Sequence, residues 1–344
     1  MSTQSQQGRQ VVVITHSKDI NGILRELQAE LGARGAHMLR FNSDEFPVRG
    51  EVFFSQDDAG GRLTFRQGGS EVTLGPRDAV WYRRARWGGQ LPQDMDKQLR
   101  HGCVEETEAL LRGVLAAAPC PIVDSPELVR KNGHKPFQLR LAQSLGLATP
   151  RTLMTNDAQA AREFMASCPR GVVAKMLSAF SVFNDTGEEQ VVFTTALSDQ
   201  HLDKLDGLRY CPMVFQERVE KQVELRVTAV GNRLFAAAVD SQATAGAEVD
   251  WRERGVTLLQ SWQPYTLPRD VEDKLHRYMT AIGMQYSAID LIVEPSGRHV
   301  FLEANPAGEC FWLQHNCPHF PLSAALADVL LDVPGTRRRF SEGG

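Results

Sequence analysis

Two carboxylates and an amide occur close together near the end of the chain, in SAIDLIVEPSGRHVFLEANP. The pattern predicts two strands joined by a short hairpin loop, closed by Glu294 and His299. In that register Asp290 lies opposite Glu303, and side-chain alternation puts Asn305 on the face of Glu303. Facing carboxylates repel each other, and oxygen donors of this kind suit Mg²⁺. The segment therefore predicts a magnesium site.

An exposed hairpin with acidic residues on its solvated face is the competing interpretation. The residues around the carboxylates argue against it, because they are apolar on both predicted faces: Ala288, Ile289, Leu291, Ile292, Phe301 and Leu302. Buried carboxylates require partners. The composition of the segment therefore favours the metal site.

Charged side chains also interrupt apolar strands earlier in the chain. Lys175 lies within GVVAKML, where its ammonium is a natural partner for phosphate, although a lysine can also snorkel from a sheet edge. The segment QERVEKQVELRV ends one predicted strand at Glu217 and puts Glu224 and Arg226 on one face of the next. A solvated hairpin face explains that segment equally well when it is taken alone.

A third group of charges follows the predicted strand AVWY. Arg83, Arg84 and Arg86 can bind the carboxylates of an acidic peptide, because guanidinium groups pair with carboxylates bidentately. A surface salt-bridge cluster is the alternative. The sequence leaves the two interpretations open.

The elements that position these side chains alternate between strands and helices, which predicts an α/β protein. The opening strand-helix-strand pattern lacks a GxGxxG motif, so a dinucleotide site has no support. We expect three α/β domains, residues 1–125, 126–212 and 213–334, followed by a frayed tail, residues 335–344.

The composition excludes some functions. The net charge is -4, and 42% of the residues are hydrophobic, which gives no reason to expect nucleic acid or a membrane surface as partner. The first residues form no apolar signal core, and no apolar stretch approaches membrane-spanning length. The six cysteines form no CxxC pair, so we expect reduced thiols and a cytoplasmic protein.

Taken in order, the charged motifs between Asn132 and Asn316 resemble those of the ATP-grasp superfamily. The resemblance implies an ATP-grasp fold with ATP held between the central and C-terminal sheets. It implies that Lys135 and Lys175 contact the phosphates, and that Glu217 and the backbone near Val219 and Glu220 contact the adenine. It also implies that Glu224 holds the ribose, with Glu220 as a second candidate. The implied magnesium ligands are Asp290, Glu303 and Asn305.

A closer similarity is to the graspetide ligases, which cyclise ribosomal peptides of the microviridin and plesiocin kind. It is carried by AVWYRRARW, by VDSQ and by VDWRERG. It implies that Asp or Glu side chains of a precursor peptide are phosphorylated and joined to Ser or Thr hydroxyls, or to Lys amines. It also implies that the central domain binds the leader of that peptide.

The sequence departs from some ATP-grasp ligases at Ala288, where they carry an arginine two residues before the first metal aspartate. A catalytic cation must then come from elsewhere, and Arg226, Arg252 and Arg254 are the candidates. We also expect a homodimer. A ligase of free amino acids and a non-catalytic peptide-binding module are the alternative functions.

Overall fold

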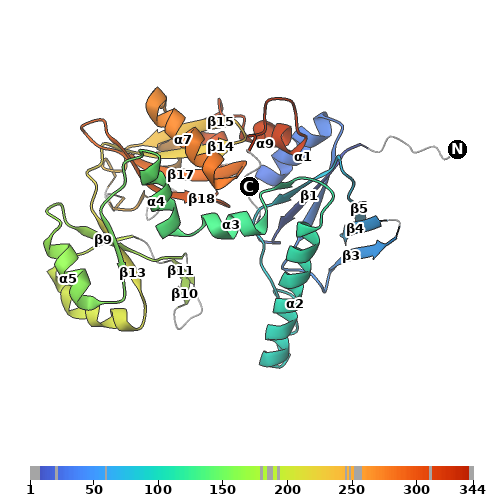
Figure 1. The fold of residues 1–344 in the computed structure, drawn as a ribbon, viewed down its shortest axis with the longest axis horizontal. Helices are drawn as coiled ribbons and strands as arrows, with labels where there is room; N and C mark the ends of the chain where they lie inside the picture. Colours follow the sequence, from blue (N-terminus) through green and yellow to red (C-terminus); the bar gives the residue numbers. More distant parts are fainter. Residues whose placement is uncertain are drawn as a thin grey trace.

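The computed structural model confirms an α/β architecture of three units that follow one another along the chain (Figure 1). It describes residues 8–19, 22–58, 60–178, 181–183, 189–191, 194–244, 246–247, 249–251, 258–309 and 312–340. Within these residues no helix is long and apolar enough to cross a membrane.

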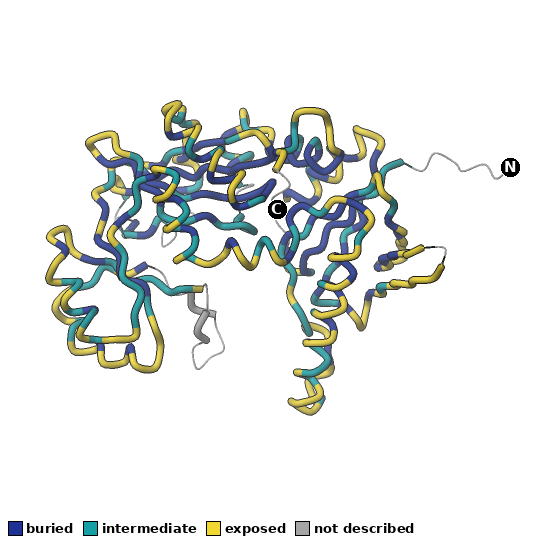
Figure 2. The backbone as a smooth tube through the Cα atoms, viewed as in Figure 1, coloured by how far each residue is buried: buried dark blue, intermediate teal, exposed yellow. Residues whose placement is uncertain are grey.

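The first unit is a parallel sheet with the strand order β2-β1-β6-β7. Its strands are β1 (Gln10–Thr15), β2 (His37–Asn42), β6 (Ala79–Tyr82) and β7 (Ile122–Val123). Two helices and a small antiparallel sheet complete it: α1 (Ile23–Ala33), α2 (Lys97–Ala116), β3 (Gly50–Asp57), β4 (Gly60–Gln67) and β5 (Ser70–Thr73). The first turns of α2 project away from the sheet and are mostly exposed (Figure 2).

The central unit is a smaller antiparallel sheet with the order β12-β9-β13-β8. Two helices, α3 (Pro126–Asn132) and α4 (Lys135–Ser144), lead into it. Its strands are β8 (Thr152–Thr155), β9 (Val172–Lys175), β12 (Thr195–Ala196) and β13 (Met213–Glu217). It also contains α5 (Ala158–Ala166), the 3-10 helix η1 (Asp199–Arg209) and a hairpin of β10 (Ser181–Phe183) and β11 (Glu189–Val191).

The C-terminal unit is a sheet with the order β16-β15-β14-β17-β18. Its strands are β14 (Val223–Val230), β15 (Arg233–Val239), β16 (Gln263–Pro264), β17 (Tyr286–Val293) and β18 (His299–Asn305). The helical elements are η3 (Leu259–Ser261), α7 (Arg269–Ile282), α8 (Trp312–Asn316) and α9 (Leu322–Leu330). Gly283 ends α7 with a φ of 70°, a left-handed cap that suits glycine.

The first and C-terminal units share one hydrophobic core. Val11 and Leu27 of the first unit lie in the same buried cluster as Ala288 and Leu326 of the C-terminal unit, and α1 packs against α9. The other face of the C-terminal sheet is covered by the apolar side of α7. The sheet of the central unit has a separate buried cluster around Phe215, whereas Ala142 of α4 lies in the cluster of the C-terminal sheet and α7. Two of the three units therefore form a single packed body.

Three predictions about the elements need correction. The segment Met213–Glu217 pairs with β8 and β9 in the central sheet, so we propose that the C-terminal unit begins after Glu217. The hairpin is closed by Val293 and His299, one residue earlier than predicted. The tail is ordered through residue 340, and Arg338 is buried and donates to the carbonyl oxygen of Gly231 at 2.8 Å.

A buried acid joins the first unit to the C-terminal sheet. Asp124 follows β7 and accepts hydrogen bonds from the backbone N–H groups of Gln285 and Tyr286, at 2.9 Å each, where β17 begins. Burial raises the pKa of Asp124 to about 7, although both N–H groups favour the ionised form. The junction is therefore most stable when this carboxyl group is protonated.

This acid predicts a pH-dependent stability. An unfolded aspartate titrates near pH 4, so the stabilisation from Asp124 is fully present below about pH 4 and is lost as the pH rises through about 7. The loss is at most about 1.4 kcal/mol per pH unit in that window. We expect Asp124→Asn to flatten the decline, as measured by urea unfolding at several pH values. Asp206→Asn, on the surface, is the control, and an equal decline in Asp124→Asn would contradict the prediction.

Candidate active site

The last two strands bring the predicted metal ligands together. Asp290 of β17 pairs with Glu303 of β18, and Ala288 pairs with Asn305 two residues away on each strand. A β-bulge next to Asp290 compensates for the earlier closure of the hairpin, so the expected facing pair is kept. The amide nitrogen of Asn305 donates to Asp290 at 3.2 Å and to Glu303 at 3.4 Å. The three side chains lie on one face, as predicted.

Each of the facing carboxylates has a cationic partner. Arg226 lies beside Asp290 in the sheet and donates from Nη1 to both of its carboxylate oxygens, at 2.7 and 2.9 Å. Lys135, the first residue of α4, forms an ion pair with Glu303. These cations offset the repulsion between the two carboxylates. Arg226, one of the three candidate catalytic cations, therefore lies beside the predicted metal ligands.

The position of Lys135 is set by a buried amide in the same helix. Gln138 donates from Nε2 to the carbonyl oxygen of Ala304 at 2.6 Å and accepts from its N–H at 3.0 Å. A further bond runs from the N–H of Phe301 to the carbonyl oxygen of Ala148 at 2.7 Å. These contacts fix α4 and the following segment against the outer edge of β18.

A cavity of about 320 Å³ lies between the central and C-terminal sheets and includes the metal site. Of the predicted residues, it is lined by Lys175, Glu217, Val219, Glu224, Arg226, Asp290, Glu303 and Asn305, and also by Arg84 of the first unit. Lys135 reaches it through Glu303. Its size lies at the lower end of the range for small-molecule sites. All three units contribute to its wall.

A second group of polar residues in the cavity is arranged around Glu224. Lys221 donates to Glu224 Oε1 at 2.9 Å and to the carbonyl oxygen of Val249 at 2.9 Å, and Ser241 donates to the same carboxylate at 2.6 Å. Burial raises the pKa of Glu224, although Lys221 and Ser241 act in the opposite direction. Glu220, the second ribose candidate, is exposed and lines a separate cavity.

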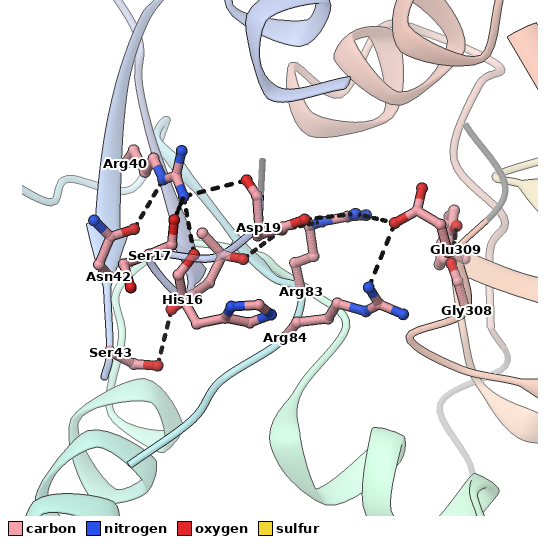
Figure 3. Close-up of polar contacts among 12 residues, drawn as sticks. His16, Ser17, Asp19, Arg40, Asn42, Ser43, Arg83, Arg84, Gly308 and Glu309 are labelled. Atoms are coloured by element: carbon pink, nitrogen blue, oxygen red, sulfur yellow. Dashed lines mark hydrogen bonds and ion pairs between the residues drawn. The ribbon is translucent and has the colours of Figure 1, made fainter. Parts of the chain in front are cut away.

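The predicted arginine cluster divides in two. The Arg83 side chain is 2% exposed and forms ion pairs with Asp19 and Glu309, whereas the Arg84 side chain is 37% exposed and lies 3.5 Å from Glu309 (Figure 3). Arg86 is exposed and is not one of the described residues that line the cavity. Only Arg84 of the three faces the candidate active site.

Other predicted positions lie outside the described residues. They include Arg252 and Arg254, the alternative catalytic cations, and most of the polar connection between residues 178 and 187. Their roles stay predictions.

Several residues that line the cavity were given no role in the sequence analysis. Lys221, Asp250, Trp251 and Glu309 line the cavity, and Asp250 accepts a hydrogen bond from the N–H of Thr194 at 3.2 Å. Lys221 could have been found, because it lies three residues before Glu224 in a predicted hairpin connection. Asp250 and Trp251 lie within VDWRERG, a motif of the graspetide similarity that could have marked them, whereas no local pattern identifies Glu309.

The segment after β18 is packed tightly against the metal site. A Cβ atom at Gly308 would lie 2.8 Å from the Cβ atoms of both Ala288 and Asn305. The hydroxyl of Tyr286 donates to the carbonyl oxygen of Gly308 at 2.6 Å. The small residue at position 288 therefore makes room for this segment.

A cavity between two antiparallel sheets, lined by facing carboxylates and by Lys175, is the arrangement that defines an ATP-grasp ligase. Residues 10–130 match the family model of the MvdD pre-ATP grasp domain. No curated protein matches the chain.

Solved structures extend the similarity over nearly the whole chain. Macrocyclase MdnC from Microcystis aeruginosa MRC, bound with precursor peptide MdnA, is 37% identical, with a TM-score of 0.84 over 94% of this chain and 99% of that chain. A RiPP-associated ATP-grasp ligase from Chryseobacterium gregarium, in complex with ADP and a leader and core peptide, is 33% identical, with a TM-score of 0.89 over 96% and 99%. Macrocyclase MdnB is 30% identical, with a TM-score of 0.77 over 94% and 99%. The chain belongs to this family of RiPP-modifying ATP-grasp ligases.

The tight packing of Gly308 predicts the effect of adding one methyl group. We expect Gly308→Ala to lower the free energy of unfolding by about 1–3 kcal/mol, because the neighbouring atoms are backbone and short side chains that cannot yield. Gly102→Ala in α2 is the matched control, since a Cβ atom there meets nothing within 4 Å. Urea unfolding measures both variants, and equal stability of the two would show that the segment adapts.

Proposed function

We propose that the chain is an ATP-dependent peptide macrocyclase. It transfers the γ-phosphoryl group of ATP to an Asp or Glu side chain of a precursor peptide, giving an acyl phosphate and ADP. A Ser or Thr hydroxyl, or a Lys amine, then attacks the carbonyl carbon, and phosphate leaves. Each closure removes one water from the peptide. The observation that supports this most directly is the facing pair of Asp290 and Glu303 in the inter-sheet cavity.

The side chains present suit Mg²⁺ and a nucleotide. Two carboxylates and an amide can supply hard oxygen donors to Mg²⁺, which would replace the ion pairs that the carboxylates form with Arg226 and Lys135. When bound, Mg²⁺ would supply a Lewis acid that neutralises charge on the phosphates. Glu217, Val219 and Glu224 line the same cavity, and we assign the adenine to Glu217 and the backbone at Val219 and the ribose to Glu224.

The cationic residues have separate roles in this proposal. Lys135 and Lys175 hold the phosphates, and Arg226 stabilises charge on the reacting carboxyl group. Arg84 lines the same cavity from the first unit and faces the approaching acidic side chain. Arg252 and Arg254 remain candidates for the same task.

A second cavity in the central unit is suited to the leader of the precursor. It has a volume of about 350 Å³ and lies between η1 and the strands β9 and β13. Most of its lining is apolar, including Leu205, Leu208 and Phe215, and Lys175 borders this cavity as well as the nucleotide cavity. Leader binding there would act directly on a phosphate-binding lysine, which couples leader and nucleotide binding.

The expected assembly and location stay predictions. We expect a homodimer, which light scattering measures, in the cytoplasm. The net charge of -4 still gives no support for a nucleic-acid partner.

The decisive experiment is an activity assay with the proposed substrates. With ATP, Mg²⁺ and a candidate precursor peptide, we expect mass spectrometry to show loss of one water per ring and release of one ADP per ring. Glu303→Gln should reduce turnover by at least about 100-fold, because it removes a metal-binding charge without changing the volume. Ligation of free glutamate, with the precursor left unchanged, would favour an amino-acid ligase instead.

Leader recognition predicts a specific variant. A leader peptide added separately should accelerate conversion of a leaderless core and tighten ATP binding. Gly207 of η1 lines the second cavity, and a Cβ atom there meets nothing within 4 Å. Gly207→Phe should therefore fill part of this cavity and reduce the stimulation by the leader about tenfold. Gly102→Phe is the control, at an equally open position in α2. Equal stimulation of both variants would place the leader elsewhere.

A further inference from the structure

A buried arginine of the first unit is linked to the candidate metal site through one loop. Arg83 follows β6, and its backbone N–H still donates to the carbonyl oxygen of Ile14 at 3.0 Å. Strand-like alternation therefore continues past the end of β6 and turns this side chain inward, on the side of the buried Trp81. The guanidinium group lies 5.1 Å from the ring centroid of Trp81.

Both arms of this guanidinium group are used. Arg83 donates from Nε to Asp19 Oδ2 at 2.6 Å and from Nη2 to Asp19 Oδ1 at 3.2 Å. The Nη2 atom also donates to Glu309 Oε2 at 2.6 Å (Figure 3). Asp19 is fully buried and accepts a further hydrogen bond from the hydroxyl of Thr15 at 2.5 Å. Asp19 thus fixes Arg83, and Arg83 fixes Glu309.

Glu309 connects this pair to the predicted catalytic residues through its backbone. Its carbonyl oxygen accepts a hydrogen bond from Arg226 Nη2 at 2.6 Å, and Nη1 of the same arginine holds Asp290. The preceding residue, Gly308, packs against Ala288 and Asn305 and cannot shift toward them. A change in the position of Glu309 therefore reaches Arg226 and Asp290 directly.

We propose that Arg83 is a positioning residue, which holds the loop at Glu309 so that Arg226 is aimed at Asp290. The chain of contacts runs from Asp19 through Arg83 and Glu309 to Arg226. Arg84, which is partly exposed and lines the cavity, is the substrate-facing arginine of the pair. The first unit thereby positions the predicted metal site, although all the predicted metal ligands belong to the C-terminal unit. This inference rests on the proposed ligase function.

The charges favour this role over direct substrate binding by Arg83. Burial alone would lower its pKa, but the hydrogen bond to Asp19 and the charges of Glu309 and Asp19 raise it, so the guanidinium group stays charged. A buried cation that bridges two carboxylates loses its partners if it turns to a ligand, and that exchange is costly. A bridging guanidinium group also cannot be replaced by the single ammonium of lysine.

The test is a double-mutant cycle between Arg83 and Arg226. Arg83→Lys should lower kcat by roughly 10–100-fold and leave KM for ATP within about twofold. In an Arg226→Lys background the same change should have little further effect, because both act through one contact. Arg34→Gln is the matched control, since it removes another ion pair between the same two units, Arg34 to Asp328, away from the cavity.

A second variant and a second measurement keep the outcome decisive. Glu309→Gln keeps the size of the side chain and serves as the substitute if Arg83→Lys folds poorly. It should show the same loss of kcat that we expect for Arg83→Lys. Binding of Mn²⁺ with ADP, followed by electron paramagnetic resonance, should weaken roughly tenfold in both variants and stay unchanged in Arg34→Gln.

Two results would overturn the proposal. One is independent effects of Arg83→Lys and Arg226→Lys on kcat, and the other is unchanged Mn²⁺ binding in Arg83→Lys and Glu309→Gln. A wild-type protein that does not act on precursor peptides would contradict the proposed function alone, because Mn²⁺ binding still measures the positioning role.

Discussion

Two carboxylates face each other across neighbouring strands, and the placement of the surrounding elements depends on this pair. Asp290 and Glu303 are held by the backbone register and cannot separate without breaking the sheet. Their repulsion must be offset by cations that other elements bring, and these come from β14 and from the start of α4. Both cations are fixed by contacts of their own, Arg226 by the carbonyl oxygen of Glu309 and Lys135 by the helix that Gln138 holds against β18.

The division of the hydrophobic core fits a clamp around the cavity. The first and C-terminal units share one buried cluster, so they form the rigid side, which carries the metal ligands and Arg84. The central unit has its own cluster and carries Lys175 and Glu217. The helix α4 packs with the C-terminal sheet, so the part that we expect to move relative to the rigid side is the central sheet with α5 and η1. A buried hydrogen bond from the N–H of Thr194 to Asp250 crosses that boundary.

Much of the fold and part of the site could be predicted from the sequence, because strand alternation is a local property. The pairing of Asp290 with Glu303 was correct although the predicted hairpin closure was one residue late, since a β-bulge absorbs the difference. Glu309 was missed because its importance comes from Arg83, 226 residues earlier in the chain. The assignment of Met213–Glu217 to the wrong sheet has a similar cause, because strand partners are set by packing and not by sequence order.

The outer edge of β18 has a consequence for how a peptide can approach. Gln138 and the backbone of Ala148 already bond to the main chain of Ala304 and Phe301 at that edge. An extended peptide cannot add there as another strand, so main-chain pairing cannot fix one register of the peptide beside the metal ligands. A core segment must instead present its acids one at a time through side-chain contacts. That arrangement suits an enzyme that acts on several positions of one flexible chain.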